Sequence, residues 1–240
     1  MKIEGRNAIA EAIRAGRTIE KVLVAEGNMD GSAKVLFAKI KEANIKIQVC
    51  KRNVLDTESE GGRHQGFIAF ATEFVYSELS DILEFAKSKN QPPLLVALDC
   101  LEDPHNLGSI IRTCECLGAH GIIITKNRSV TVNDTVMRVA QGASEYVKIA
   151  KVTNLNQTLD NLKKEGLWII GADMDGEDIR SADLSGAVCL VIGGEGQGVS
   201  QLTKKTCDKL ISIKMNGQIN SLNASVATGI VLYEAVKGRF

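Results

Sequence analysis

The sequence predicts an α/β protein in which a mostly parallel sheet carries helices on both faces. The first observation is the run LLVAL at residues 94–98, which is apolar throughout, as in a strand covered on both sides. The second is that four similar runs follow, separated by segments with helical patterns, and such alternation is typical of a parallel sheet. These strands are expected at 121–125, 147–150, 167–171 and 188–192, and the helices at about 106–118, 133–140, 154–165 and 199–206.

A smaller alternating α/β unit precedes this sheet. Its first helix is indicated by apolar residues with helical spacing at Ala8, Ile9, Ala12 and Ile13. A second helix is expected at 33–43, and strands at 22–24, 45–49 and 67–70. Residues 73–91 are polar and partly helical, and Pro92-Pro93 ends them. The sequence therefore predicts a domain of residues 1–72, a linker of 73–91 and a larger domain of 92–240.

The composition narrows the class of protein. In 240 residues, 29 basic side chains balance 29 acidic ones, which argues against a protein held on nucleic acid by bulk electrostatics alone. No segment reaches the ~20 apolar residues that cross a bilayer, and no apolar signal core opens the chain. The six cysteines form no C-x-x-C pair and only three histidines are present, so no zinc pattern appears. We expect a cytoplasmic protein with reduced thiols, no membrane partner and no metal.

The stretch from Asp99 to Arg112 directly follows a predicted strand, where ligands of such sheets collect. Asp103 and Pro104 suit the N-cap and the first position of a helix. In that helix Asn106, Ser109 and Arg112 lie three residues apart on a face away from the apolar stripe. Arg112 is then either an ordinary surface arginine or a group that binds a phosphate or a developing oxyanion.

A glycine-rich loop follows the strand at 188–192. Gly194 and Gly196 begin a G-x-G pattern, but the third glycine of a dinucleotide-binding loop would fall at Val199. We therefore reject a nicotinamide cofactor. What remains is a loop of bare backbone with one acid, Glu195, at its centre.

The stretch from Ile211 to Lys237 begins as a strand end, because Ile211, Ile213 and Met215 alternate. A turn at Asn216-Gly217 follows, and a helix is expected at 224–236. Ser221 and Asn223 precede this helix, so both are candidate helix caps as well as candidate site residues. Small residues near the start of the helix indicate that one of its faces is tightly packed.

A second glycine-rich loop lies at residues 60–66 in the smaller unit. Its glycines allow a backbone to approach a ligand phosphate, with Arg63 alongside, and an ordinary flexible loop explains them equally simply.

Three of these stretches together resemble the motifs of the SPOUT-type RNA ribose 2′-O-methyltransferases. They are DPHNLGSIIRT, IGGEGQGVSQLTKKTCD and ISIKMNGQINSLNASVATGIVLYEAV. The chain is most similar to the subfamily that methylates a guanosine ribose of 23S ribosomal RNA, which also has an IEG-x-NA helix start and an HQG loop, here at residues 3–8 and 64–66.

This resemblance implies a deep trefoil knot in the C-terminal domain, an L30e-like RNA-binding domain at the N-terminus and a homodimer formed through the catalytic domain. It also implies S-adenosylmethionine as the cofactor. The residues implied to bind it are Gly193, Gly194, Gly196, Ile213, Met215 and Leu222, and those implied to bind substrate are Arg63, His64 and Gln65.

The catalytic residues expected on this basis are Arg112, Asn106, Glu195, Ser221 and Asn223. An arginine side chain holds its proton too tightly to serve easily as a base. Arg112 would instead stabilise the forming 2′-alkoxide or hold a neighbouring phosphate. The asparagines would position the ribose or Arg112, Glu195 would pair with or orient Arg112, and Ser221 would contact the substrate or its own loop. Two alternatives remain open: a transfer-RNA ribose methyltransferase, and a non-catalytic RNA-binding or ribosome-assembly protein.

Overall fold

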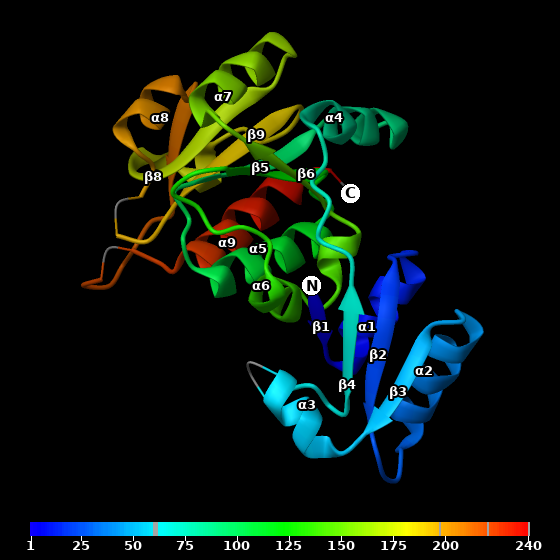
Figure 1. Cartoon of the computed structure of the whole chain (residues 1–240). Coiled ribbons are helices and arrows are strands. Elements are labelled where there is room, and N and C mark those ends of the chain that lie inside the picture. The colour runs from blue at the N-terminus through cyan, green and yellow to red at the C-terminus, as the bar shows by residue number, and fades with distance from the viewer. Residues whose placement is uncertain (60–61, 197, 220, 240) are drawn as a thin grey trace. The chain divides into compact units, whose positions relative to one another are not determined.

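The computed structural model describes residues 1–59, 62–196, 198–219 and 221–239, and it divides into two compact units. The first contains residues 1–75 and 132–146, and the second contains 76–131 and 147–240 (Figure 1). The chain therefore passes between the units three times. The segment 132–146 lies inside the larger domain of the predicted division, and its contacts instead join it to the first unit.

The second unit is built on six parallel strands in the order β10-β8-β9-β5-β6-β7, which confirms the predicted sheet. The strands are β5 (Leu94–Asp99), β6 (Gly121–Thr125), β7 (Lys148–Val152), β8 (Trp168–Asp178), β9 (Val188–Gly193) and β10 (Lys209–Ser212). The central strand β5 is buried at all six positions, as its unbroken apolar run requires.

Helices cover both faces of this sheet (Figure 1). The helices are α4 (Leu79–Ser88), α5 (Pro104–Cys116), α7 (Leu155–Lys164), α8 (Gln201–Thr206) and α9 (Ala224–Val236), with a short 3-10 turn at Ile179–Ser181. Leu159 of α7 and Ile82 of α4 share one core cluster with the strands, while α5 packs against α9 on the other face. Ile82 lies within the predicted linker, so that segment also contributes to the core of the second unit.

The edge pair β8 and β10 contains an irregularity that shapes the site. Leu210 pairs with Gly171, but the next residue, Ile211, pairs with Glu177, so residues 172–176 of β8 leave the regular ladder. Gly176 permits this close approach, because a Cβ there would lie 2.4 Å from the backbone nitrogen of Ile211. β10 ends at Ser212, earlier than the predicted strand end at Met215, and the chain beyond it is free to line a pocket.

The first unit has a mixed four-stranded sheet in the order β1-β4-β2-β3. Its elements are β1 (Lys2–Glu4), α1 (Arg6–Arg14), β2 (Ile19–Ala25), α2 (Gly31–Glu42), β3 (Lys46–Cys50), α3 (Arg52–Glu58), β4 (Phe67–Ala71), α6 (Asp134–Ala140) and a 3-10 turn at Ala143–Glu145. The sequence analysis did not identify β1 or α3, which are only three and seven residues long. A largely buried ion pair, Arg17 Nη1 to Glu145 Oε1 at 2.7 Å, ties the 132–146 segment into this unit.

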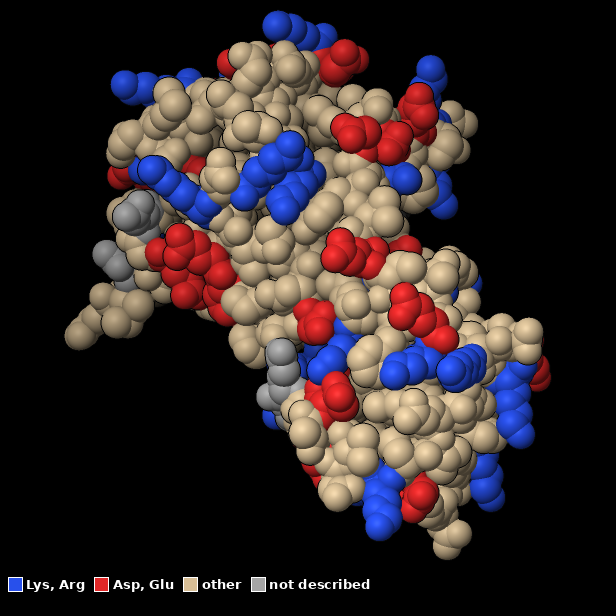
Figure 2. All heavy atoms as spheres, viewed as in Figure 1, with Lys and Arg blue, Asp and Glu red and all other residues tan. Residues whose placement is uncertain are grey.

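Basic and acidic side chains are interspersed over the face shown in Figure 2, in keeping with the balanced net charge. Over the described residues, no helix is long and apolar enough to span a bilayer. The trefoil knot implied by the resemblance stays a prediction.

Candidate active site

A cavity of about 710 Å³ opens in the second unit where strands β8, β9 and β10 end. Ligands of open α/β sheets bind at the carboxyl ends of the strands, and this volume is in the usual range for ligand pockets. The wall is formed by residues from the irregular part of β8, the glycine loop after β9, the segment after β10 and the start of α9, with Lys204 from α8.

All six residues predicted to bind the cofactor line this cavity: Gly193, Gly194, Gly196, Ile213, Met215 and Leu222. Two of the glycines are also required by the fold itself. A Cβ on Gly193 would lie 1.9 Å from the carbonyl carbon of Gly198, and a Cβ on Gly194 would lie 2.2 Å from the carbonyl oxygen of Cys100. Gly196 has a φ of +83° with open space around it, so it lets the loop turn.

The cavity has an acidic character that the sequence analysis did not find. Lys204 Nζ lies 2.7 Å from Asp173 Oδ1 and 3.5 Å from Asp175 Oδ2, and all three residues line the wall with Glu195. The hydrogen bond that Lys204 donates to Asp173 raises the pKa of Lys204, so the ammonium is held in its charged form. Three carboxylates against one ammonium leave a negative wall, which suits a positively charged ligand.

A cluster of three polar side chains borders the cavity. Asn106 Nδ2 donates to Glu195 Oε1 at 2.7 Å, and Asn223 Nδ2 donates both to Glu195 Oε1 and to Asn106 Oδ1 at 2.9 Å. The cluster joins residues 117 positions apart in the chain. Glu195 is therefore held by two amides, and the predicted pairing of Glu195 with Arg112 is not found among the described residues.

Helix caps hold both asparagines in place. Asn223 is the N-cap of α9, and its Oδ1 accepts hydrogen bonds from the backbone N–H groups of Ser225 and Val226. Because the cap fixes Oδ1, the amide nitrogen must point toward Glu195. Asn106 lies in the first turn of α5, whose N-cap Asp103 accepts from its backbone N–H at 3.1 Å. Asn223 is thus both the cap and the site residue that the sequence left as alternatives.

The buried carboxylate of Asp99 holds the glycine loop in place. Asp99, at the end of β5, is 5% exposed, and its Oδ2 accepts a hydrogen bond from the backbone N–H of Ser200 at 2.9 Å. Its carbonyl oxygen accepts from the N–H of Gly194 at 2.8 Å. Asp99 therefore fixes both ends of the loop that carries Glu195.

Two predicted catalytic residues are less constrained. Arg112 is exposed on α5, and its guanidinium makes no hydrogen bond or ion pair with any other residue that the structure describes. Ser221 is exposed on the cavity wall. A guanidinium without a protein partner keeps its donors for a ligand.

The three residues predicted to bind substrate lie in the first unit and differ in environment. Arg63 and Gln65 are exposed, but His64 is completely buried. His64 Nδ1 accepts from the N–H of Gly66 at 3.0 Å, and Nε2 lies 2.9 Å from Asp56 Oδ1. With both ring nitrogens occupied, His64 holds the loop in shape, and we no longer expect it to touch RNA. Glu60 and Gly61 of this loop lie outside the described residues.

Two family models match the chain. Residues 93–233 match the SpoU rRNA Methylase family, and residues 2–77 match a domain described as RNA 2′-O ribose methyltransferase substrate binding. A Bacillus subtilis relative, named as a TrmH family tRNA/rRNA methyltransferase, is 42% identical over 98% of this chain and 94% of its own length. The chain belongs to the SpoU rRNA methylase family. It is an RNA 2′-O-ribose methyltransferase that uses S-adenosylmethionine.

Solved structures of similar proteins agree with the fold. An AdoMet-bound rRNA methyltransferase from Sinorhizobium meliloti is 25% identical, with a TM-score of 0.81 over 100% of this chain and 87% of that one. A TrmH/SpoU tRNA modifying enzyme from A. aeolicus is 33% identical, with a TM-score of 0.58 over 67% of this chain and 83% of that one.

Within this SpoU-family chain, Asp173, Asp175 and Lys204 are the charged pocket residues that sequence reasoning missed. A usable signal was present, because Asp173 lies two residues after the apolar run at 167–171, and we had already applied the strand-end rule to Asp99 and Gly193. The irregularity that turns these acids into the cavity depends on β10, which lies more than 30 residues further along the chain.

Proposed function

We propose that this protein methylates the ribose 2′-hydroxyl of a guanosine in large-subunit ribosomal RNA. The observation that carries the proposal is the cavity at the strand ends, where all six residues expected to bind the methyl donor meet the Asn106–Glu195–Asn223 cluster. The ribosomal target is supported by the substrate-binding domain at residues 2–77 and by the full-length match to an rRNA methyltransferase.

The residues present fit the methyl donor. Bound here, S-adenosylmethionine would supply a methyl group on a positively charged sulfur: the bond from the methyl carbon to sulfur would break as its bond to the ribose 2′-oxygen forms, S-adenosylhomocysteine would leave, and the hydroxyl proton would pass to water. Ile213, Met215 and Leu222 offer apolar surface for the adenine, and the glycine loop offers backbone groups at close range. The carboxylates of Asp173 and Glu195 favour the donor's positive charge.

Arg112 acts on the ribose side of the reaction. Its guanidinium stays protonated, so it stabilises negative charge on the 2′-oxygen and on a neighbouring phosphate and does not remove the proton. Asn106 and Asn223 both donate to Oε1 of Glu195, so they fix the orientation of the whole carboxylate, including Oε2. Two helix caps in turn hold the two asparagines. Alignment of the 2′-oxygen with the methyl group supplies much of the rate acceleration.

We propose further that the catalytic unit forms a homodimer through α9. Val226, Ile230 and Tyr233 recur at helical spacing on its surface and are 50%, 39% and 66% exposed. One of the small residues near the start of α9, Gly229, packs against α5 instead, where a Cβ on it would lie 3.8 Å from Thr113 Cγ2. Light scattering of an Ile230→Asp protein tests this: we expect a monomer, and an unchanged dimer would exclude α9 as the interface.

A transfer-RNA target is the second candidate. It is favoured by the 33% identity to a tRNA modifying enzyme and by the name of the Bacillus subtilis relative, which includes both kinds of RNA. That match covers only 67% of this chain, whereas the rRNA methyltransferase covers all of it.

Incubation with methyl-labelled S-adenosylmethionine and separate rRNA and tRNA transcripts decides between the two. We expect label in the large-subunit rRNA, on a nucleoside that mass spectrometry identifies as 2′-O-methylguanosine. Label in tRNA alone would support the second candidate. Label on a base, or in neither RNA, would contradict the proposed function.

A further inference from the structure

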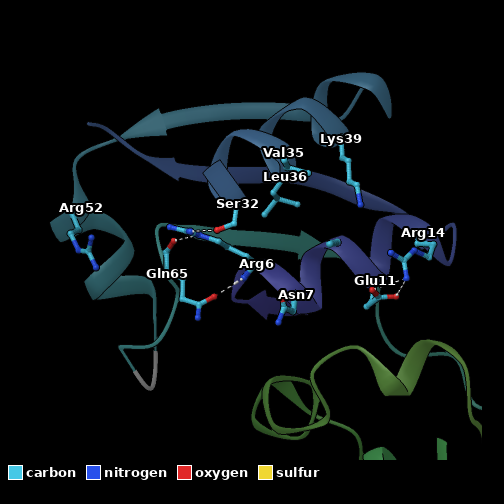
Figure 3. Close-up of a pocket in the computed structure, with 11 residues that line it drawn as sticks. Arg6, Asn7, Glu11, Arg14, Ser32, Val35, Leu36, Lys39, Arg52 and Gln65 are labelled. Atoms are coloured by element: carbon cyan, nitrogen blue, oxygen red, sulfur yellow. Dashed lines mark hydrogen bonds and ion pairs between the residues drawn. The ribbon is translucent and has the colours of Figure 1, made fainter. Parts of the chain in front are cut away.

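The first unit contains a cavity of about 720 Å³ between helices α1, α2 and α3, beside the HQG loop (Figure 3). We propose that this cavity binds the phosphate backbone of the RNA substrate. The inference rests on the proposed function, since it assigns to particular side chains a contact with the same substrate.

The cavity wall is strongly basic in a chain with no net charge. Four cationic residues, Arg6, Arg14, Lys39 and Arg52, line it against a single acid, Glu11. They do not form one cluster. Figure 3 shows Arg52 at one end of the cavity, Arg6 near the middle, and Lys39 and Arg14 at the other end. A row of positive charges matches a ligand with repeated negative charges, such as a nucleic-acid strand, better than a single phosphate.

Arg6 is fixed before any ligand binds. Its Nη1 donates to both carboxylate oxygens of Asp30 at 2.7 Å and lies 2.6 Å from Ser32 Oγ, and its Nε donates to the carbonyl oxygen of Gln65 at 3.1 Å. The guanidinium holds the pKa of Asp30 well below its usual range. Holding the side chain in one geometry reduces the conformational entropy that binding would otherwise cost.

Two helices also begin at this cavity. Arg6 and Asn7 open α1, and Ser32 lies at the start of α2. The first turn of α1 has no acidic residue, and its N-cap, Gly5, has no side chain to offer. The backbone N–H of Arg6 donates to Gln65 and Asp30 caps α2, so it is the positive end of the α1 dipole that adds to the attraction of the cavity for anions.

The remaining cations differ in whether they already have an acidic partner. Arg14 pairs with Glu11 at 3.0 Å, whereas Lys39 and Arg52 have no acidic partner among the residues that the structure describes. Lys39 and Arg52 lie at opposite ends of the cavity (Figure 3), so both ends have a charge available for a phosphate.

The cavity is linked to the loop that we predicted to contact substrate. Gln65 Oε1 accepts from the backbone N–H of Arg6 at 3.1 Å, so the two hydrogen bonds between these residues join the loop to the start of α1. Gln65 itself lines the cavity. The HQG loop can therefore contact the RNA through Gln65, without the buried His64.

The test is a double variant, Lys39→Gln with Arg52→Gln, in the full-length protein. Its matched control is Lys34→Gln with Lys46→Gln, which removes two exposed cations outside the cavity. RNA binding is measured against salt concentration with a large-subunit rRNA fragment, and circular dichroism checks the fold. Loss of two phosphate contacts should lower the slope of log K against log salt by about 1.4 and weaken binding roughly tenfold at physiological salt.

We also expect the cavity variant to raise the KM for RNA and to leave kcat and the KM for S-adenosylmethionine unchanged. Equal effects in the control and the cavity variant, or none in either, would overturn the proposal. If the wild type methylates no RNA but the cavity variant still loses RNA affinity and salt dependence, the proposed function fails and the inference stands. Retained RNA affinity with lost affinity for an acidic protein would assign the cavity to a different partner.

Discussion

The two cavities of this protein have almost the same volume, about 710 and 720 Å³, but opposite chemistry. The cavity of the second unit is made of bare backbone and apolar residues at strand ends, with three acids and one ammonium. The cavity of the first unit is made of long basic side chains where helices begin. The difference teaches that a chain with a net charge of zero can present a locally negative and a locally positive cavity, as our proposal of a cationic donor in one and a polyanionic substrate in the other requires.

The largest effect should come from Arg112, the residue that we propose acts on the ribose side of the reaction. Arg112→Ala should lower kcat about 100- to 1000-fold, the range found when one group that stabilises an oxyanion is removed. The affinity for S-adenosylmethionine, measured by calorimetry, should stay within about twofold. Arg112→Lys, which keeps the charge without the planar fork, should recover part of the rate. Full turnover by a folded Arg112→Ala protein would remove this residue from the mechanism.

The double role of Asn223 can be separated by two substitutions. Asn223→Asp keeps the oxygen that caps α9 but loses the amide donor and places a charge against Glu195, so turnover should fall about tenfold or more with little loss of stability. Asn223→Ala should lose the same turnover and about 1 kcal/mol of stability as well. Urea unfolding and methyl-transfer rates measure the two effects. Equal stability of both variants would contradict the capping role.

The role of the acidic wall in cofactor binding can be tested by comparing a positively charged ligand with an analogue that lacks that charge. Asp173→Asn should weaken binding of S-adenosylmethionine about tenfold, because the acid lies within the cavity and is only 7% exposed. Binding of S-adenosylhomocysteine, which lacks the positive sulfur, should change less. Asp175→Asn is the control, since its 74% exposed side chain is screened by solvent. Equal losses for the two ligands would show that Asp173 acts through packing and not through charge.

The smallest effect concerns the fold that supports the site. Burial, together with the charge of Arg239, lowers the pKa of His120, whose Nδ1 accepts a hydrogen bond from the N–H of Leu94. A histidine kept neutral in the fold takes up its proton on unfolding, so the free energy of unfolding should fall as pH drops through about 6.5. Urea unfolding between pH 8 and 5.5 should show a shallower slope for His120→Asn. The exposed His105→Asn should keep the wild-type slope.

Local signals in the sequence were sufficient for elements whose cause is local. The helix 224–236 and the strand 121–125 were predicted with the bounds that the structure has, and Asp103 and Pro104 take their predicted places in α5. Caps and unbroken apolar runs act over a few residues, so one stretch of sequence carries all the information.

The remainder depends on partners far along the chain. The partners of His64 are nearer, since Gly66 and Asp56 lie two and eight residues away, but only the folded loop brings both to its ring nitrogens. The sequence at 133–140 predicts an ordinary helix, and only contacts with distant residues, such as the buried pair of Glu145 with Arg17, show that 132–146 belongs to the first unit. The two asparagines that orient Glu195 lie 89 and 28 residues away from it. Periodicity predicts elements, and it does not predict which polar groups they bring together.

The most direct test of this division of labour is a calorimetric titration of S-adenosylmethionine into three proteins: the wild type, Asp173→Asn, and the Lys39→Gln and Arg52→Gln double variant. We predict a Kd about tenfold higher for Asp173→Asn and an unchanged Kd for the double variant. An unchanged Kd for Asp173→Asn together with a raised Kd for the double variant would contradict the assignment of donor and substrate to the two cavities.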